Sequence, residues 1–428
     1  MRRSEEMADP VRLRAERLAT ASSCCGFLGE VTLTDSAVII LFAGMLGAGD
    51  ALSMITTSVL PLLNGLCIIP MAGLAMKIGM RRQILRACFC ASAAYFTAVA
   101  SPFFGEAGVM VLIASVFLFA FSLTGFIAGW FPLLDTFLEP ERRTLFFSRM
   151  RFCHQLSGTV FLFLVGFVIG GNPPVWGLQL VLLAGAVIFT GRAAAISRIP
   201  VFEGAQNERP GFFSGLNSVV GNKPMAGFSL YFFLLNLTAF GTVPLMMLYL
   251  KNGLNAPDNV IVLISACSLS GMLFGYLCIG RLLKRIGMKH TFLLLHFIFF
   301  AVNGGLFLIG GRSMATYLLI AFFLLVYSFA AAASSIVASA EMMKLASPGN
   351  KIMAMAFNGA FFYGGSGLSR FLTSLLLGSG MFAAEWQLGA TTVCRYRTFL
   401  LLYCAAILLA APFLLLVPAV NSGKSNKP

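Results

Sequence analysis

The sequence has few charged side chains and very few histidines. Of 428 residues, 11% are charged and three are histidine, whereas 58% are apolar, above the roughly half apolar composition of soluble domains. None of the three histidines has a nearby Asp or Glu in the pattern of a membrane acyltransferase or metalloprotease. We therefore expect no enzyme, no metal centre and no cofactor.

Two further motifs are missing. The ten cysteines include no C-x-x-C pair and nearly all lie within apolar runs, which is typical of packing residues rather than of a disulfide or metal framework. Residues 423–425 read Gly-Lys-Ser, as at the end of a phosphate loop, but residue 418 is Pro where that motif needs its first Gly. A nucleotide-driven pump is not indicated.

Long apolar runs dominate what is present. Runs of about 20 residues, the length that crosses roughly 30 Å of hydrocarbon, recur between residues 18 and 419. They predict an all-α integral membrane protein with twelve transmembrane helices. The predicted spans are residues 18–43, 52–76, 83–100, 109–134, 149–170, 176–196, 225–250, 259–280, 291–311, 314–343, 352–378 and 398–417.

Two short basic turns divide the chain into similar halves. Residues 72–82 and 280–290 each end in Ile-Gly-Met and two basic residues, and their glycines, Gly79 and Gly287, lie 208 positions apart. The loops at 140–143 and 348–351 repeat at the same offset. The predicted organisation is an N-terminal tail (1–17), a six-helix bundle (18–196), a polar linker (197–224), a second six-helix bundle (225–419) and a C-terminal tail (420–428).

The formal net charge of +14 fits a membrane better than a nucleic acid, because the basic residues lie in turns and form no basic domain. With the N-terminus inside, 25 of the 30 Lys and Arg residues fall in the tails or in the even-numbered turns. By the positive-inside rule, both termini are cytoplasmic and the protein is a multi-pass protein of the cell membrane. We expect the lipid bilayer, and no nucleic acid, as its surroundings.

The two basic turns carry a resemblance to the major facilitator superfamily. Its signature turn reads Gly-x-Leu-Ala-Asp-Arg-x-Gly-Arg-Arg; the matching residues here are Leu74, Ala75, Lys77, Gly79 and Arg81 in one copy and Gly280, Leu282, Arg285, Gly287 and Lys289 in the other. The resemblance implies gating turns on the cytoplasmic side, formed by Lys77, Gly79, Arg81, Arg285, Gly287 and Lys289. The family's latching Asp is replaced by Met76 and Lys284, and a methionine cannot form its charge pairs.

The same resemblance implies two six-helix bundles that face a central cavity and rock around a midplane site. The first, fourth, seventh and tenth spans would line that cavity, with contributions from the second, fifth, eighth and eleventh. Polar or aromatic residues on these spans are substrate-contact candidates, each with the alternative of an interhelical hydrogen bond. They are Thr34, Trp130, Gln155, Asn236, Thr238, Tyr327, Asn358 and Tyr363. His154 and His296 are interpreted as structural.

The most informative charged residues within predicted spans are Glu30, Asp35 and Arg370. An ionised side chain at mid-bilayer costs at least about 2.5–3.5 kcal/mol, so such residues usually face a cavity or a partner. Asp35 and Arg370 both lie about 26 Å from the inner ends of their spans at about 1.5 Å per residue, so they could pair. Arg370 could instead hold an anionic group of the substrate. Glu30 lies nearer the midplane, on another face of the same span.

The sequence predicts a secondary active transporter that moves a small polar solute by alternating access, with proton symport through Glu30 or Asp35. Burial favours a protonated carboxyl group, and an approaching Arg or substrate favours the carboxylate. Two acids and one Arg suit a polar or zwitterionic solute, a sugar or a cationic drug. The alternatives are a non-transporting sensor or partner protein with a transporter fold, and an uncoupled facilitator. We expect a monomer.

Overall fold

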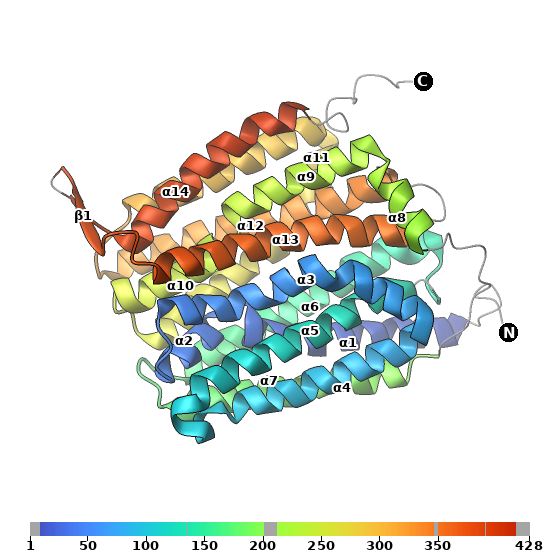
Figure 1. The fold of residues 1–428 in the computed structure, drawn as a ribbon, viewed down its shortest axis with the longest axis horizontal. Helices are drawn as coiled ribbons and strands as arrows, with labels where there is room; N and C mark the ends of the chain where they lie inside the picture. Colours follow the sequence, from blue (N-terminus) through green and yellow to red (C-terminus); the bar gives the residue numbers. More distant parts are fainter. Residues whose placement is uncertain (1–8, 135, 201–211, 346–349, 390, 417–428) are drawn as a thin grey trace.

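The computed structural model describes residues 9–134, 136–200, 212–345, 350–389 and 391–416, which are nearly all helical (Figure 1). Up to the polar linker, the elements are α1 (Asp9–Thr34), α2 (Ala37–Met45), α3 (Asp50–Ile78), α4 (Met80–Val99), η2 (Ser101–Ala107), α5 (Gly108–Leu134), α6 (Pro140–Val168) and α7 (Val175–Ser197). From the linker onward they are α8 (Phe212–Val220), α9 (Lys223–Ala239), α10 (Thr242–Leu248), η3 (Tyr249–Gly253), α11 (Asp258–Leu308), α12 (Met314–Leu345), α13 (Lys351–Gly378), β1 (Glu385–Leu388), β2 (Thr391–Cys394), α14 (Arg395–Ala410) and η4 (Ala411–Leu416).

Each predicted span lies mainly on a helix. In the described part of the chain, eight helices are long and apolar enough to cross a membrane, or nine if the bent pair α1 and α2 is one span. The 51-residue α11 contains two predicted spans, residues 259–280 and 291–311. The helices α4 and α13 are outside the apolar set, since α4 begins with several arginines and α13 is rich in Gly and Ser.

The first predicted span, residues 18–43, is wrong as a single helix. The helix α1 begins at Asp9, within the segment predicted as a tail, and ends at Thr34; α2 then begins at Ala37 after a bend of 41°. Ser36 causes the restart, because its backbone is extended and its hydroxyl accepts a bond from the Val38 amide at 3.3 Å, as an N-cap does. The bend leaves Asp35 outside either helix.

Both basic turns depend on a glycine. Gly79 separates α3 from α4 with φ of +90°, and Gly287 kinks α11 with φ of +73°. L-residues with a side chain rarely adopt this left-handed region, whereas glycine does so without steric cost. The signature turns therefore bend where the repeated sequence places its glycines.

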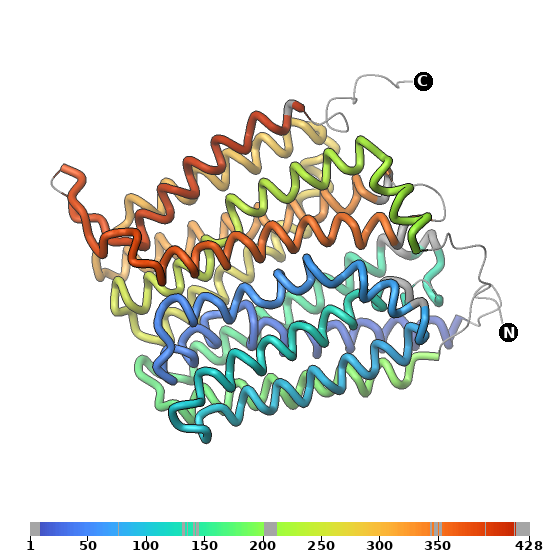
Figure 2. The backbone as a smooth tube through the Cα atoms, viewed as in Figure 1, coloured from blue at the N-terminus to red at the C-terminus, as the bar shows by residue number. Residues whose placement is uncertain are grey.

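The first and second parts of the chain lie side by side in the trace, blue to green beside yellow-green to red (Figure 2). Helix α3 packs along α13, and α6 packs along α11. Glycines allow the first of these contacts: a Cβ on Gly65 would collide with the backbone of Gly364, and one on Gly367 with the backbone of Leu62. Close backbone approach through small residues is the usual packing mode of membrane helices.

A short antiparallel hairpin, β1 with β2, pairs Glu385 with Cys394 and projects from one end of the molecule (Figure 1). We call this the hairpin end. The opposite end, where α1 begins and η4 ends, is the termini end. Neither the hairpin nor the helix α8, which lies within the predicted linker at residues 197–224, was predicted from the sequence.

Candidate functional site

An ion pair joins the two parts of the chain in the interior. Asp35, in the bend between α1 and α2, accepts a hydrogen bond from Arg370 of α13, with 2.7 Å between Oδ1 and Nη1. The same guanidinium donates to the carbonyl of Thr57 on α3 at 2.9 Å and to the carbonyl of Phe240 after α9 at 3.3 Å. The predicted pairing of Asp35 with Arg370 is confirmed. Arg370 thus ties together four helical segments.

A second ion pair was not predicted. Glu30 on α1 pairs with Arg192, which is 4% exposed near the end of α7. The Arg192 guanidinium lies over the rings of Phe126 and Phe189, at 4.1 and 5.3 Å from their centroids, in cation–π geometry. It occupies the place that a Cβ on Gly26 would need, so the glycine lets the arginine cross α1.

The sequence analysis counted Arg192 among the basic residues of the cytoplasmic turns, and this assignment is wrong. The signal was present, since Arg192 precedes the apolar residues 193–196 within the predicted sixth span. A basic residue one turn before a helix end can point back into the bundle. A count of charges between spans does not detect this direction. Glu30 and Asp35 therefore each have an arginine partner.

The two acids differ in access. The Asp35 side chain is 54% exposed and that of Glu30 is 21% exposed. A cavity of about 10 Å³ lies beside Asp35, between α2, α3, α10 and α11. Its lining consists of Asp35, Ser36, Ile40, Thr57, Val243, Pro244, Met247 and Ser265. This volume holds about one water molecule and is too small for an organic solute.

A cluster around Asp50 ties the two parts of the chain at the hairpin end. Asp50 begins α3 and accepts hydrogen bonds from Arg395 and from the Tyr396 hydroxyl at 2.5 Å each, and from Asn252 at 2.6 Å. All three donors belong to the second part of the chain. Close by, the Ser374 hydroxyl donates to the Ala51 carbonyl at 2.7 Å. No role was predicted for Asp50 from the sequence.

At the termini end, Arg12 pairs with Glu139, and Arg142 lies 3.8 Å from Glu16, both within the first part. Of the predicted gating residues, Arg81 donates to the Ser197 carbonyl at 2.6 Å, again within the first part. Those that remain are partly or fully exposed on that end: Lys77, Gly79, Arg285, Gly287 and Lys289.

Several predicted cavity-lining residues make internal hydrogen bonds. Gln155 of α6 donates to the Leu269 carbonyl of α11 at 3.0 Å, across the two parts of the chain. Asn236 donates to the Phe362 carbonyl at 3.1 Å and Tyr327 to the Ala239 carbonyl at 2.6 Å. These three residues fit the alternative of interhelical bonding.

The remaining candidates divide in two. Thr34 and Thr238 bond to carbonyls of their own helices at 2.7 and 2.9 Å, and Trp130 is buried with its ring stacked on that of Phe126 at 5.2 Å. Asn358 and Tyr363 on α13 differ from these. The Oδ1 atom of Asn358 is buried and has no hydrogen-bond partner among the described residues, and the Tyr363 side chain is partly exposed.

The two buried histidines pack against neighbours, in agreement with their structural interpretation. The ring of His154 lies 4.6 Å from that of Phe27 between centroids, with Nδ1 3.0 Å from the Ser23 hydroxyl. His296 stacks on Tyr231, and its Nδ1 lies 3.3 Å from the Tyr231 hydroxyl.

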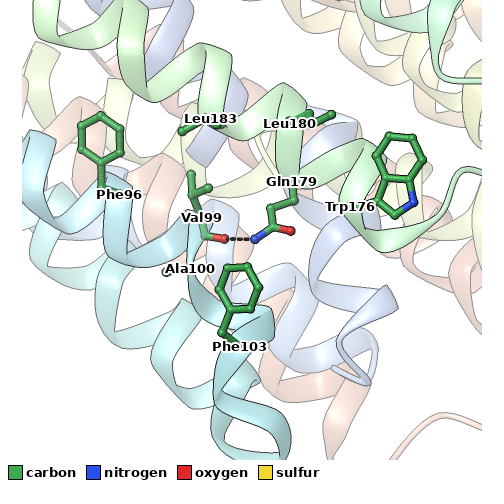
Figure 3. Close-up of a pocket in the computed structure, with 8 residues that line it drawn as sticks. All are labelled: Phe96, Val99, Ala100, Phe103, Trp176, Gln179, Leu180 and Leu183. Atoms are coloured by element: carbon green, nitrogen blue, oxygen red, sulfur yellow. Dashed lines mark hydrogen bonds between the residues drawn. The ribbon is translucent and has the colours of Figure 1, made fainter.

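A separate groove of about 450 Å³ lies between α4, η2 and α7 (Figure 3). Its lining is apolar apart from Gln179, which donates to the Val99 carbonyl at 2.9 Å, and it includes the exposed rings of Phe103 and Trp176. No charged side chain lines it. The groove is typical of a lipid-facing surface, and the charged candidates lie elsewhere.

The fold and its long apolar helices define a multi-pass helical membrane protein. The family model for the Major Facilitator Superfamily matches residues 21–369, so the chain belongs to this superfamily. No curated protein matches the sequence. Family and structural neighbours together indicate a solute transporter and not an enzyme.

Three solved structures illustrate the similarity. The nucleoside transporter NupG is 14% identical, with 95% of this chain and 98% of that chain covered and a TM-score of 0.65. A D-xylose–proton symporter is 10% identical, with 94% and 96% covered and a TM-score of 0.70. A bacterial homologue of the iron transporter ferroportin in an inward-facing state is 14% identical, with 95% and 97% covered and a TM-score of 0.63. At these identities, the likeness concerns the fold alone.

Proposed function

We propose that this protein is a secondary active transporter that moves a small polar solute across the cell membrane by alternating access, in symport with protons. The observation that carries the proposal is the ion pair between Asp35 and Arg370, which links the two parts of the chain inside the membrane. A scaffold protein has no need of such a pair, because desolvating both charges is costly. A protein whose halves must separate can use it as a switch.

The proposed architecture has twelve spans in two six-helix bundles. To the nine spans supported by apolar character, it adds α4 and α13, and it counts α11 as two spans because Gly287 kinks that helix. The charge distribution supports cytoplasmic termini, so the hairpin end lies outside. The proposed transport unit is a monomer, since one chain supplies both bundles and the cavity between them.

The polar contacts of Asp35 and Asp50 join the two bundles toward the hairpin end, which supports a state closed to the outside. Rocking to the opposite state must separate Asp35 from Arg370 and Asp50 from its three donors. A second set of contacts must then form at the termini end. This exchange of contacts around a midplane site is the usual form of alternating access between related repeats.

We infer that Asp35, rather than Glu30, carries the coupling proton. The partner of Asp35 lies in the other bundle, so the pair breaks when the outside opens, and a protonated Asp35 makes that separation less costly. Glu30 and Arg192 lie in the same bundle, so their pair persists through the rocking. In this proposal, Glu30 holds Arg192 in place and does not exchange protons.

Purified protein in liposomes that contain a pH-sensitive dye tests the proposal. The panel comprises nucleosides, D-xylose and other sugars, amino acids, organic acids, cationic drugs and iron(II), which include the solute classes of the similar structures. We expect one solute class to drive proton entry and Asp35→Asn to abolish that entry. In Glu30→Gln, the proton signal should remain proportional to the solute uptake of that variant.

The other outcomes identify the alternatives. Solute movement without protons in the wild type indicates an uncoupled facilitator. Absence of both movement and binding across the panel indicates a non-transporting sensor, an alternative favoured by Met76, which replaces the acidic residue of the signature turn. Loss of coupling in Glu30→Gln but not in Asp35→Asn overturns the assignment of the proton to Asp35.

A further inference from the structure

The cationic residue Arg151 lies inside a membrane-spanning segment without an ionic partner. Residues Leu145–Val168 of α6 are long and apolar enough to span a membrane, and Arg151 lies about 9 Å from the start of this segment at 1.5 Å per residue. Its side chain is partly exposed, and in the described part of the chain no carboxylate forms an ion pair with it. An unpaired charge at this depth is costly and marks a pathway or a binding site.

Its direction follows from its neighbours on the helix. At about 100° per residue, Arg151 points between His154, which contacts Ser23 of α1, and Gln155, which donates to the Leu269 carbonyl of α11. The side chain therefore faces the space between α1 of the first bundle and α11 of the second. Arg149 points about 160° away and is exposed.

Two partly exposed tyrosine side chains from other helices share this space. Tyr276 lies two turns from Leu269 on the same face of α11 and interacts electrostatically with Arg151. Tyr363 of α13 interacts electrostatically with Glu30, Arg151 and Tyr276. Helices α1, α6, α11 and α13 thus contribute polar groups to one region, on the termini side of the Gln155 contact.

The charges in this region do not cancel. Glu30 is paired with Arg192, and Asp35 is paired with Arg370, so neither of these two carboxylates is free to receive a cationic group. One positive charge remains, that of Arg151. This differs from the sequence-based expectation of two acids and one Arg, which suited zwitterionic and cationic solutes.

Resting on the proposed transport function, we propose that Arg151 binds the carboxylate of the transported solute, with Tyr276 and Tyr363 as hydroxyl donors, and that the substrate is a small organic monocarboxylate. The planar guanidinium presents two N–H groups that match the two carboxylate oxygens. The tyrosine rings provide apolar surface for the organic body of the solute. A single compensating charge favours a monoanion over a dianion.

Compounds that share a skeleton test the charge requirement. Lactate, lactamide and free alanine differ in one group each, as do benzoate and benzamide, and inorganic phosphate and D-xylose extend the set. Binding to the purified protein is measured by calorimetry, and uptake is measured in liposomes. We expect the transported solute to be found in a wider panel of carboxylates. Each carboxylate that binds should bind at least about tenfold more tightly than its amide, as a charge-assisted hydrogen bond predicts.

Three variants locate the effect. Arg151→Gln should raise the KM for the carboxylate about tenfold to hundredfold and remove the preference over the amide, while Arg151→Lys should restore part of both. Arg149→Gln is the matched control on the opposite face of α6 and should behave as wild type. Thermal melting and size-exclusion profiles verify that each variant is folded.

The failures are distinguishable. If a neutral or cationic solute moves and Arg151→Gln leaves its KM within about twofold, the monocarboxylate assignment is wrong while the transport function stands. The same holds if carboxylates move with an unchanged preference in Arg151→Gln. If the wild type binds and moves nothing in either panel, the transport function itself is wrong, and the assignment falls with it.

Discussion

The ion pair between Asp35 and Arg370 should hold the hairpin end closed, and its strength can be bounded from the structure. A partner removed from a buried pair costs about 3–5 kcal/mol, whereas an exposed pair contributes about 0–1 kcal/mol. The Asp35 side chain is 54% exposed, and without it Arg370 keeps the carbonyls of Thr57 and Phe240 as acceptors. We expect Asp35→Asn to destabilise the closed state by about 1–2 kcal/mol, which is about a 5- to 30-fold shift toward opening.

The cavity beside the pair provides the assay. Ile40 lines that cavity and is 3% exposed, so a cysteine there, in a background without the native cysteines, reacts with a membrane-impermeant thiol reagent only when the hairpin end opens. The labelling rate should rise 5- to 30-fold in Asp35→Asn. A cysteine at Ile39, which is fully buried outside the cavity lining, should remain unreactive.

A double-mutant cycle decides whether the pair itself is responsible. Combining Asp35→Asn with Arg370→Gln should give less than the sum of the single effects, because two residues in contact share one interaction. An unchanged labelling rate in Asp35→Asn, or strictly additive effects in the cycle, refutes the reasoning that this pair closes the hairpin end.

Two further substitutions test the other contacts. Asp50→Asn should increase the same labelling rate several-fold, since the carboxylate receives three hydrogen bonds from the second part of the chain. Glu385→Gln on the exposed hairpin is the control. Equal labelling rates in the two variants would contradict a role of Asp50 in closing the hairpin end. Gly26→Ala should displace Arg192 and lower the free energy of unfolding by about 1–3 kcal/mol, as overpacking does. Thermal melting compares the stability of this variant with that of Gly44→Ala, where a Cβ meets nothing within 4 Å. An equal loss of stability in the two variants would contradict a specific displacement of Arg192.

The sequence predicted features that depend on position along the chain. Apolar runs placed the helices, and the two basic turns placed Gly79 and Gly287 at the sharp bends. Depth in the membrane follows from residue count, since every helical residue rises about 1.5 Å, and this brought Asp35 and Arg370 to one level. The confirmed pair therefore follows from the number of residues between each charge and the inner end of its span.

Features that depend on direction around a helix were missed. Arg192 was assigned to a turn by its position, although its side chain points back over α1 through the space left by Gly26. The break at Asp35 depends on the Ser36 cap, which apolar periodicity does not detect. The bonds of Asp50 join residues far apart in the sequence, and no local pattern contains them.

The two ends of the molecule are closed by different means, and this asymmetry bears on the resting state. At the hairpin end, charged pairs join the two parts of the chain. At the termini end, the described ion pairs stay within the first part, and the signature turn has Met76 in place of the acidic residue that would latch it. A state closed at the termini end would therefore lack the charge pairs that an acidic residue at position 76 could form. Because each state's population follows the difference in its contacts, the protein without substrate should rest closed at the hairpin end and open toward the termini.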